Sequence, residues 1–240
     1  MKQQDNFNAM DQKGFSLVEL LVVMGVVLIL TTVSLFYLTA QRKLYNTDEQ
    51  SLKIIDLIQE ARQRSLTQRE TLRVEIDLTS NTGRLINEND SAVATDDKVI
   101  RQVTFYPVSN VRADVRPTNV TTAPPEALPV PTAQFAGSLH PLSAGHNVAT
   151  FRFLLDGTVV GPGTNATGSG ATVTGATLYI WKPKATNNNE SEMTKAITIL
   201  GATASVRMWD YAKAPDGSWF WKDSRRAGYG SGSGSGSPVR

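Results

Sequence analysis

The sequence predicts an α+β fold, in which a long N-terminal helix packs against an antiparallel β-sheet domain. Three observations predict this fold. Residues 20–40 form an apolar run that contains no charged side chain. Residues 41–69 follow directly and have helical periodicity. From residue 70 onward apolar and polar residues alternate, and no further long helical pattern occurs.

The composition excludes several classes of function. The chain has 240 residues and a formal net charge of +2, which is too small an excess to indicate nucleic acid as the main partner. It has no cysteine, which excludes a disulfide scaffold, a thiol nucleophile and a cysteine-bound metal. Its two histidines, His140 and His146, have no acidic residues near them in the sequence, so we interpret them as loop residues. We therefore expect no cofactor, no metal and no enzyme activity.

The apolar run from Leu20 to Ala40 is long enough to cross a membrane. At about 1.5 Å per residue an α-helix of this length spans the hydrocarbon core of a bilayer. A cleaved signal peptide is the alternative, but its apolar region is shorter and ends in two small residues separated by one position. Here Leu38 occupies the outer of those positions. The run therefore predicts a transmembrane helix.

The segment before this helix contains one acidic residue among apolar ones. A polar stretch, residues 1–13, is followed by Gly14-Phe15-Ser16-Leu17-Val18-Glu19. Glycine suits a bond that must enter a protease cleft, because it adopts any backbone conformation. A carboxylate in hydrocarbon is costly unless it is paired, so Glu19 is a candidate functional residue. The alternative is that Glu19 lies at the level of the lipid headgroups.

This pattern resembles the processing site of type IV prepilins and type II secretion pseudopilins. The resemblance implies that prepilin peptidase cuts between Gly14 and Phe15 and methylates the new amino group of Phe15. It implies a leader (residues 1–14) in the cytoplasm, an assembly helix (residues 15–40) in the inner membrane and a globular domain on the periplasmic side. Other pilin or pseudopilin subunits and membrane lipid are the implied partners. Glu19 would neutralise the Phe15 amino group of a neighbouring subunit.

The segment at residues 41–69 predicts an amphipathic helix that continues into the globular domain. Its apolar stripe comprises Leu44, Ser51, Ile54, Ile55, Ile58, Ala61 and Leu66. Alternation then predicts antiparallel strands within residues 70–227. The strands expected are Thr71–Asp77 in a hairpin with Arg84–Ile86, then Val99–Tyr106, Thr150–Leu155, Ala176–Trp181, Ala196–Leu200 and Ser205–Asp210.

Three further segments have distinctive compositions. Residues 107–147 contain seven prolines and predict a long loop, either a partner-binding arm or an insertion between strands. Aromatic residues near the C-terminus predict either a terminal hairpin or a surface that stacks on bases; they are Trp209, Tyr211, Trp219, Phe220 and Trp221. Residues 228–240 have the composition of a Gly/Ser linker and are expected to be disordered.

The order of motifs in the domain resembles GspH/FimT-type minor pilins. The motifs are Ala61-Arg62, Leu72 to Ile76, Phe151-x-Phe153, Asp156-Gly157-Thr158, Thr177 to Ile180, Ile197 to Gly201 and Val206-Arg207. The resemblance implies a minor subunit of a type IV pilus or of a type II secretion pseudopilus. An alternative is a DNA-binding minor pilin that uses Arg207, Arg225 and Arg226. This chain has Gly201-Ala202-Thr203-Ala204 where related sequences often carry Gly-Arg-x-Arg. A third alternative is a membrane-anchored domain that does not assemble.

Overall fold

The computed structural model describes residues 16–88, 96–126, 140–161, 173 and 175–224. The chain divides into two compact units, Met1–Arg42 and Lys43–Arg240. The helix α1 (Leu17–Gln68) contributes residues to both units. The predicted cleavage position, between Gly14 and Phe15, lies outside the described residues, as do Arg225 and Arg226.

In the first unit, the helix is apolar and its described side chains are not buried. Residues Leu17–Leu35 are long and apolar enough to cross a membrane. The two threonines in this stretch bond back to the helix, Thr31 to the Val27 carbonyl at 2.7 Å and Thr32 to the Leu28 carbonyl at 2.8 Å. Their hydroxyls are therefore satisfied without water, which suits a helix in lipid.

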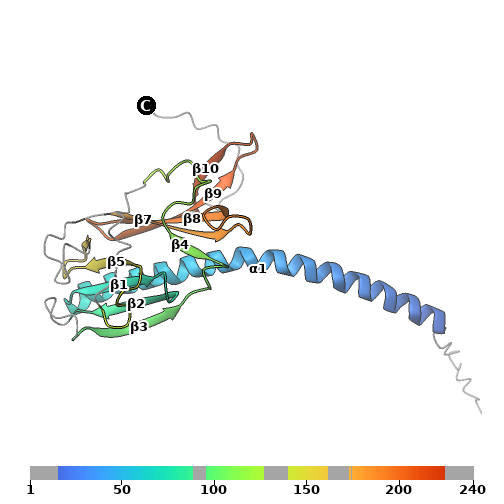
Figure 1. Cartoon of the computed structure of the whole chain (residues 1–240), viewed down its shortest axis with the longest axis horizontal. Helices are drawn as coiled ribbons and strands as arrows, with labels where there is room; N and C mark the ends of the chain where they lie inside the picture. Colours follow the sequence, from blue (N-terminus) through green and yellow to red (C-terminus); the bar gives the residue numbers. More distant parts are fainter. Residues whose placement is uncertain (1–15, 89–95, 127–139, 162–172, 174, 225–240) are drawn as a thin grey trace, which may run out of the picture. The chain divides into compact units, whose positions relative to one another are not determined.

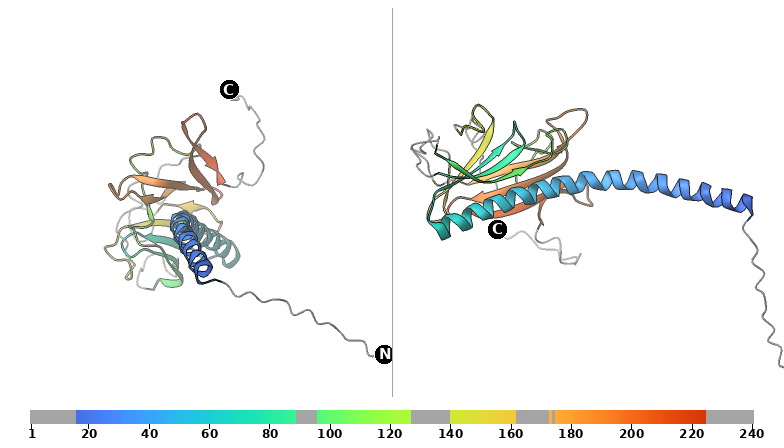
Figure 2. Two further views of the ribbon diagram at one scale, coloured as in Figure 1. Left: turned by 90° about the vertical axis from the view of Figure 1, so that its right-hand side faces the viewer. Right: turned by 90° about the horizontal axis from the view of Figure 1, so that it is seen from below.

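The second unit contains two five-stranded antiparallel sheets (Figures 1 and 2). The first has the order β3-β2-β1-β5-β6, and the second has the order β10-β9-β8-β7-β4. The strands of the first sheet are β1 (Leu72–Asp77), β2 (Thr82–Asn87), β3 (Lys98–Thr104), β5 (Val148–Phe153) and β6 (Val159–Val160). Those of the second are β4 (Arg112–Asp114), β7 (Ala176–Pro183), β8 (Ser191–Leu200), β9 (Ser205–Lys213) and β10 (Trp219–Asp223).

One hydrophobic core joins the helix to both sheets. On α1, residues Ile54, Leu57, Ile58 and Ala61 are completely buried. They belong to the same cluster as Leu72, Val74, Ile76, Phe151 and Phe153 of the first sheet and Leu178, Ile180, Ile197 and Ile199 of the second. These strand residues alternate along each strand, so one face of each sheet meets the helix. The predicted α+β fold, with a helix packed on antiparallel sheets, is confirmed.

The structure has two short strands that the sequence did not indicate. β6 has two residues, and β4 has three and lies within the segment predicted as a loop, residues 107–147. β4 pairs with β7, placing Arg112 opposite Trp181. A strand of two or three residues is too short to show an alternating pattern in the sequence. Its formation depends on the neighbouring strand with which it pairs.

Candidate processing and assembly site

Glu19 lies in the first turn of α1, and its side chain is exposed. The turn begins with a hydrogen bond from the Leu20 amide to the Ser16 carbonyl, 3.1 Å long. A carboxylate in this turn is favoured by the positive end of the helix dipole. The structure thus places Glu19 on a helix that begins at Leu17, shortly after the predicted cleavage position between Gly14 and Phe15.

The helix on both sides of Glu19 presents an apolar surface that nothing in the described part of the chain covers. Leu17 is 78% exposed, Leu21 is 66% exposed and Ile29 is 66% exposed. An uncovered apolar surface of this extent is stable only against lipid or against other apolar helices. The arrangement can therefore anchor the chain in a bilayer and can pack against like helices.

Of the basic residues predicted as a possible nucleic-acid surface, Arg207 is the one that lies among the described residues. Arg207 lies on β9, and its guanidinium contacts the Glu126 carboxylate at 2.5 Å, with both side chains about half exposed. The other two candidates, Arg225 and Arg226, lie outside the described residues.

The C-terminal aromatic residues form the predicted terminal hairpin. Strands β9 and β10 pair in register, with Tyr211 opposite Trp221. The indole nitrogen of Trp221 donates to the Thr122 carbonyl at 3.0 Å, and that of Trp209 donates to the Thr198 hydroxyl at 3.0 Å. Together with Val120, Tyr179, Trp181 and Ala196 these two tryptophans form a second hydrophobic cluster. This cluster confirms the structural interpretation of the hairpin.

A buried cluster of charged side chains, which sequence reasoning missed, covers the other face of the first sheet. The guanidinium of Arg73 on β1 contacts Glu88 and Asp97, both at 2.5 Å. It also lies 3.0 Å from Glu75. Arg152 on β5 donates two hydrogen bonds to Glu88, at 2.7 and 2.8 Å. All five side chains are at least nine-tenths buried.

A turn from the proline-rich segment closes this cluster. The Ser143 hydroxyl donates to Glu75 at 2.6 Å, and His146 lies 2.8 Å from Asp77. Asp77 also contacts Arg84 at 3.0 Å. Both histidines lie in this turn segment, as predicted, and His146 ties it to the sheet. The alternating charges of β1 were visible in the sequence. The acid that contacts His146, however, is Asp77 on β1, which lies 69 residues earlier in the chain.

Burial sets the protonation of this cluster. It lowers the pKa of His140, which is only 4% exposed, and it raises the pKa of Asp97. Asp77 is buried too, yet hydrogen bonds from Ser80, His146 and Arg84 hold its pKa well below the usual value. The neutral form of His140 and the charged form of Asp77 therefore belong to the folded state.

We expect His140 to make the second unit less stable as the pH falls below about 6.5, its ordinary pKa. The unfolded chain then binds a proton that the folded chain, with its lowered pKa, does not. His140→Gln removes this titration and keeps an acceptor for the Leu142 amide, which donates to His140 at 3.2 Å. Denaturation at a series of pH values gives the free energy of unfolding as a function of pH. Below about pH 6.5 this free energy should fall less steeply with decreasing pH in the variant than in the native chain, and an equal slope would contradict the assignment.

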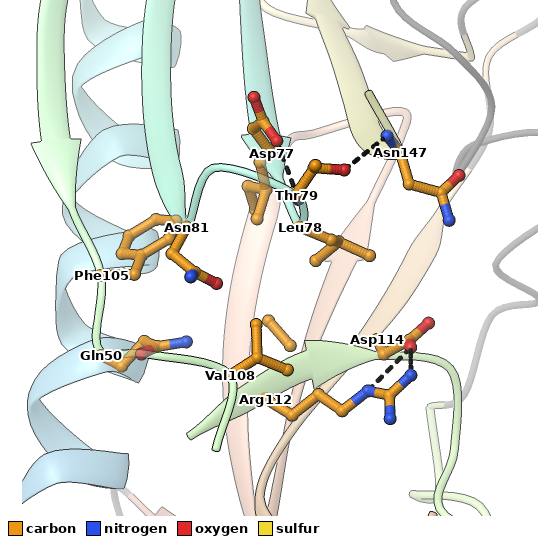
Figure 3. Close-up of a pocket in the computed structure, with 12 residues that line it drawn as sticks. Gln50, Asp77, Leu78, Thr79, Asn81, Phe105, Val108, Arg112, Asp114 and Asn147 are labelled. Carbon is orange, nitrogen blue, oxygen red and sulfur yellow. Dashed lines mark hydrogen bonds and ion pairs between the residues drawn. The ribbon is translucent and has the colours of Figure 1, made fainter. Parts of the chain in front are cut away.

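The second unit also has a small cavity between the two sheets, of about 200 Å³ (Figure 3). Its walls include Leu78, Phe105 and Val108, with Gln50 of α1 at one side. Arg112 lines it too, but its guanidinium is held by Asp114 at 2.8 Å. Among the described residues no group of acidic or histidine side chains could hold a metal ion.

Comparison with known families finds one match, to the prokaryotic N-terminal methylation motif, over residues 9–35. Comparisons with curated proteins and with solved structures gave no significant match. The matched residues include Gly14, Phe15 and Glu19 and most of the apolar helix. The motif implies a structural protein that prepilin peptidase processes, and it agrees with a single-pass membrane protein before assembly. The chain therefore combines a prepilin-type cleavage and methylation motif, typical of type IV pilins and pseudopilins, with an α+β pilin-like fold.

Proposed function

We propose that this chain is a minor pilin or pseudopilin, a structural subunit of a type IV pilus or of a type II secretion pseudopilus. The observation that carries the proposal is the methylation motif at the start of a helix whose apolar surface is uncovered from Leu17 to Leu35. A subunit of this kind is inserted in the inner membrane, with its globular domain on the periplasmic side, before it assembles into a filament. The order of motifs in the second unit favours a minor subunit of the GspH/FimT type.

Glu19 is proposed to set the register between subunits. Cleavage after Gly14 would give Phe15 a positively charged amino group at the tip of the helix. In a filament, the uncovered helices surround one another, and a carboxylate there is stable only beside a cation. The Glu19 carboxylate of one subunit and the Phe15 amino group of the next would satisfy this requirement. This pair would also set the axial register, because the rest of the helix surface gives packing but little axial specificity.

Replacement of Glu19 by valine tests this role. Glu19→Val is expected to be cleaved normally, because the scissile bond is unchanged, but to enter filaments at least about tenfold less than the native chain, because the Phe15 amino group loses its partner. Immunoblotting of sheared or purified filaments against the membrane fraction measures the ratio. Glu19→Asp keeps the charge and should retain part of the incorporation. Normal incorporation of Glu19→Val would count against the pairing.

The incorporation experiment, together with a DNA-retardation assay, distinguishes the alternatives. A membrane-anchored domain that does not assemble would be absent from filaments with or without the substitution. A DNA-binding minor pilin would assemble and would also retard DNA in a salt-dependent way. In that case the Arg207 guanidinium would exchange its exposed partner, Glu126, for a phosphate.

A further inference from the structure

The tip of the β9–β10 hairpin exposes two large aromatic side chains. Trp219 is 51% exposed and Phe220 is 43% exposed, and they are the only tryptophan and phenylalanine side chains in the described part of the chain that are exposed to this degree. The Trp219 ring stacks on Tyr211, with ring centroids 5.0 Å apart and planes 14° apart. The indole is therefore held in position while its other face is open.

The direction of β9 tells at which end of the second unit this tip lies. Near the start of β9, Val206 lines a groove together with Leu66, close to the C-terminal end of α1. Farther along, Asp210 and Asp48 share the ammonium group of Lys195. β9 therefore runs antiparallel to α1, and its last residue, Lys213, lies about 10 Å beyond Asp210. The tip lies at the end where the chain enters the second unit (Figure 1).

Two other elements expose apolar side chains at the same end. Tyr45, at the beginning of this unit on α1, is 66% exposed. Val108 is 37% exposed and follows Tyr106, whose hydroxyl donates to Glu49 at 2.5 Å and whose amide donates to Gln50 at 3.1 Å. Exposed apolar residues on a helix, a loop and a hairpin thus share one end of the unit. Exposed leucines such as Leu155 and Leu66 occur at the other end of the unit as well, so what distinguishes this end is that its exposed side chains include the aromatic residues Tyr45, Trp219 and Phe220.

Connectivity and charge indicate which partner this is. Only residues 41–44 separate the predicted membrane run from Tyr45, so this end of the unit must stay close to the bilayer surface. Lys213 is exposed opposite Trp219, and Lys222 is exposed on the same strand as Trp219. The tip's one acidic residue, Asp216, is engaged by the Ser218 amide and hydroxyl at 2.9 and 2.7 Å. Tryptophan and lysine together are typical of the interface between lipid and water.

We propose that the tip of the β9–β10 hairpin, with Trp219, Phe220 and Lys213, lies in the headgroup region of the bilayer that anchors the chain. The lipid surface is then the partner of this end of the unit until the subunit leaves the membrane. The inference rests on the membrane-anchored state of the proposed function and is independent of cleavage and of filament assembly.

Fluorescence quenching by lipid tests the proposal on the full-length chain. The protein is reconstituted into vesicles of phosphatidylethanolamine and phosphatidylglycerol, with or without bromine on the acyl chains near the headgroup. Three of the four tryptophans, Trp181, Trp209 and Trp221, are at most 9% exposed and are expected to be little quenched. The emission of Trp219 is obtained by subtracting the emission of the Trp219→Phe variant from that of the native chain. It should be about twofold lower in brominated than in unbrominated vesicles, because interfacial indoles lie next to the upper acyl chain.

A tryptophan at the other end of the unit is the matched control. Leu155 is 54% exposed, and it lies beside Gly157, where an added Cβ would lie 2.8 Å from Leu66, near the C-terminal end of α1. Leu155→Trp in the Trp219→Phe background should not be quenched. Equal quenching at positions 219 and 155, or none at 219, would overturn the inference.

Flotation of the same vesicles separates this inference from the proposed function. A chain that floats while Trp219 remains unquenched keeps its membrane anchor, and only the inference fails. A chain that does not float contradicts the anchor and therefore both. Salt-dependent quenching of Trp219 by single-stranded oligothymidylate, with no effect of bromolipid, would overturn the lipid assignment in favour of a nucleic-acid surface.

Discussion

Substitution of Gly14 by leucine is expected to leave the chain at its full length in cells that contain an active prepilin peptidase. The bond after residue 14 must fit a protease cleft in an extended form, and a bulky side chain beside it obstructs that fit. The native chain should begin at an N-methylated Phe15, whereas Gly14→Leu should still begin at Met1. Intact-mass spectrometry of membrane-extracted protein measures the difference in mass between the two chains, which corresponds to the leader, residues 1–14.

Gly25 provides the control for this experiment. It lies in the apolar helix, and a Cβ added there would meet nothing within 4 Å. Gly25→Leu therefore adds the same bulk to the neighbouring helix without touching the scissile bond, and cleavage should proceed. Loss of cleavage in both variants would indicate defective insertion rather than a blocked site. A native chain that still began at Met1 would contradict processing altogether.

Removal of the Glu88 side chain is expected to cause the largest loss of stability in the second unit. Glu88 accepts hydrogen bonds from both Arg73 and Arg152 at 2.5–2.8 Å, and its side chain is 1% exposed. Glu88→Ala leaves two guanidinium groups buried without their shared partner. Breaking a buried pair in this way costs about 3–5 kcal/mol. Denaturant titration of the full-length protein in detergent, followed by tryptophan emission, measures the change.

Two further variants show whether the cluster acts as a unit. Glu190→Ala removes one partner of an exposed ion pair, with Lys184 at 2.7 Å, and should leave the transition midpoint unchanged because solvent screens this pair. Combining Glu88→Ala with Arg152→Ala should cost less than the two single changes added together, because the second change removes a charge that the first left unpaired. Additive effects would show that Glu88 does not hold Arg152.

The sequence by itself determined the features that depend on local order. The uncharged run, the Gly14–Glu19 motif and the alternation after residue 70 each predict their element, because length, periodicity and composition set the local structure. The C-terminal hairpin was one of two structures that the sequence predicted there, from the turn at Asp216-Gly217 and the aromatic residues beside it, and strand pairing in the structure confirms it.

Only the tertiary structure decided whether the polar face of β1 is buried or exposed to water. Arg73, Glu75 and Asp77 alternate with core residues, and alternation alone does not tell buried ion pairs from a face in water. Their partners come from distant positions, namely Glu88, Asp97, residues 140–146 and Arg152, and long-range pairing of this kind has no signature in a single sequence. The same reason applies to β4, and to the placing of Trp219 and Tyr45 at one end of the unit, because strand direction depends on pairing across the whole sheet.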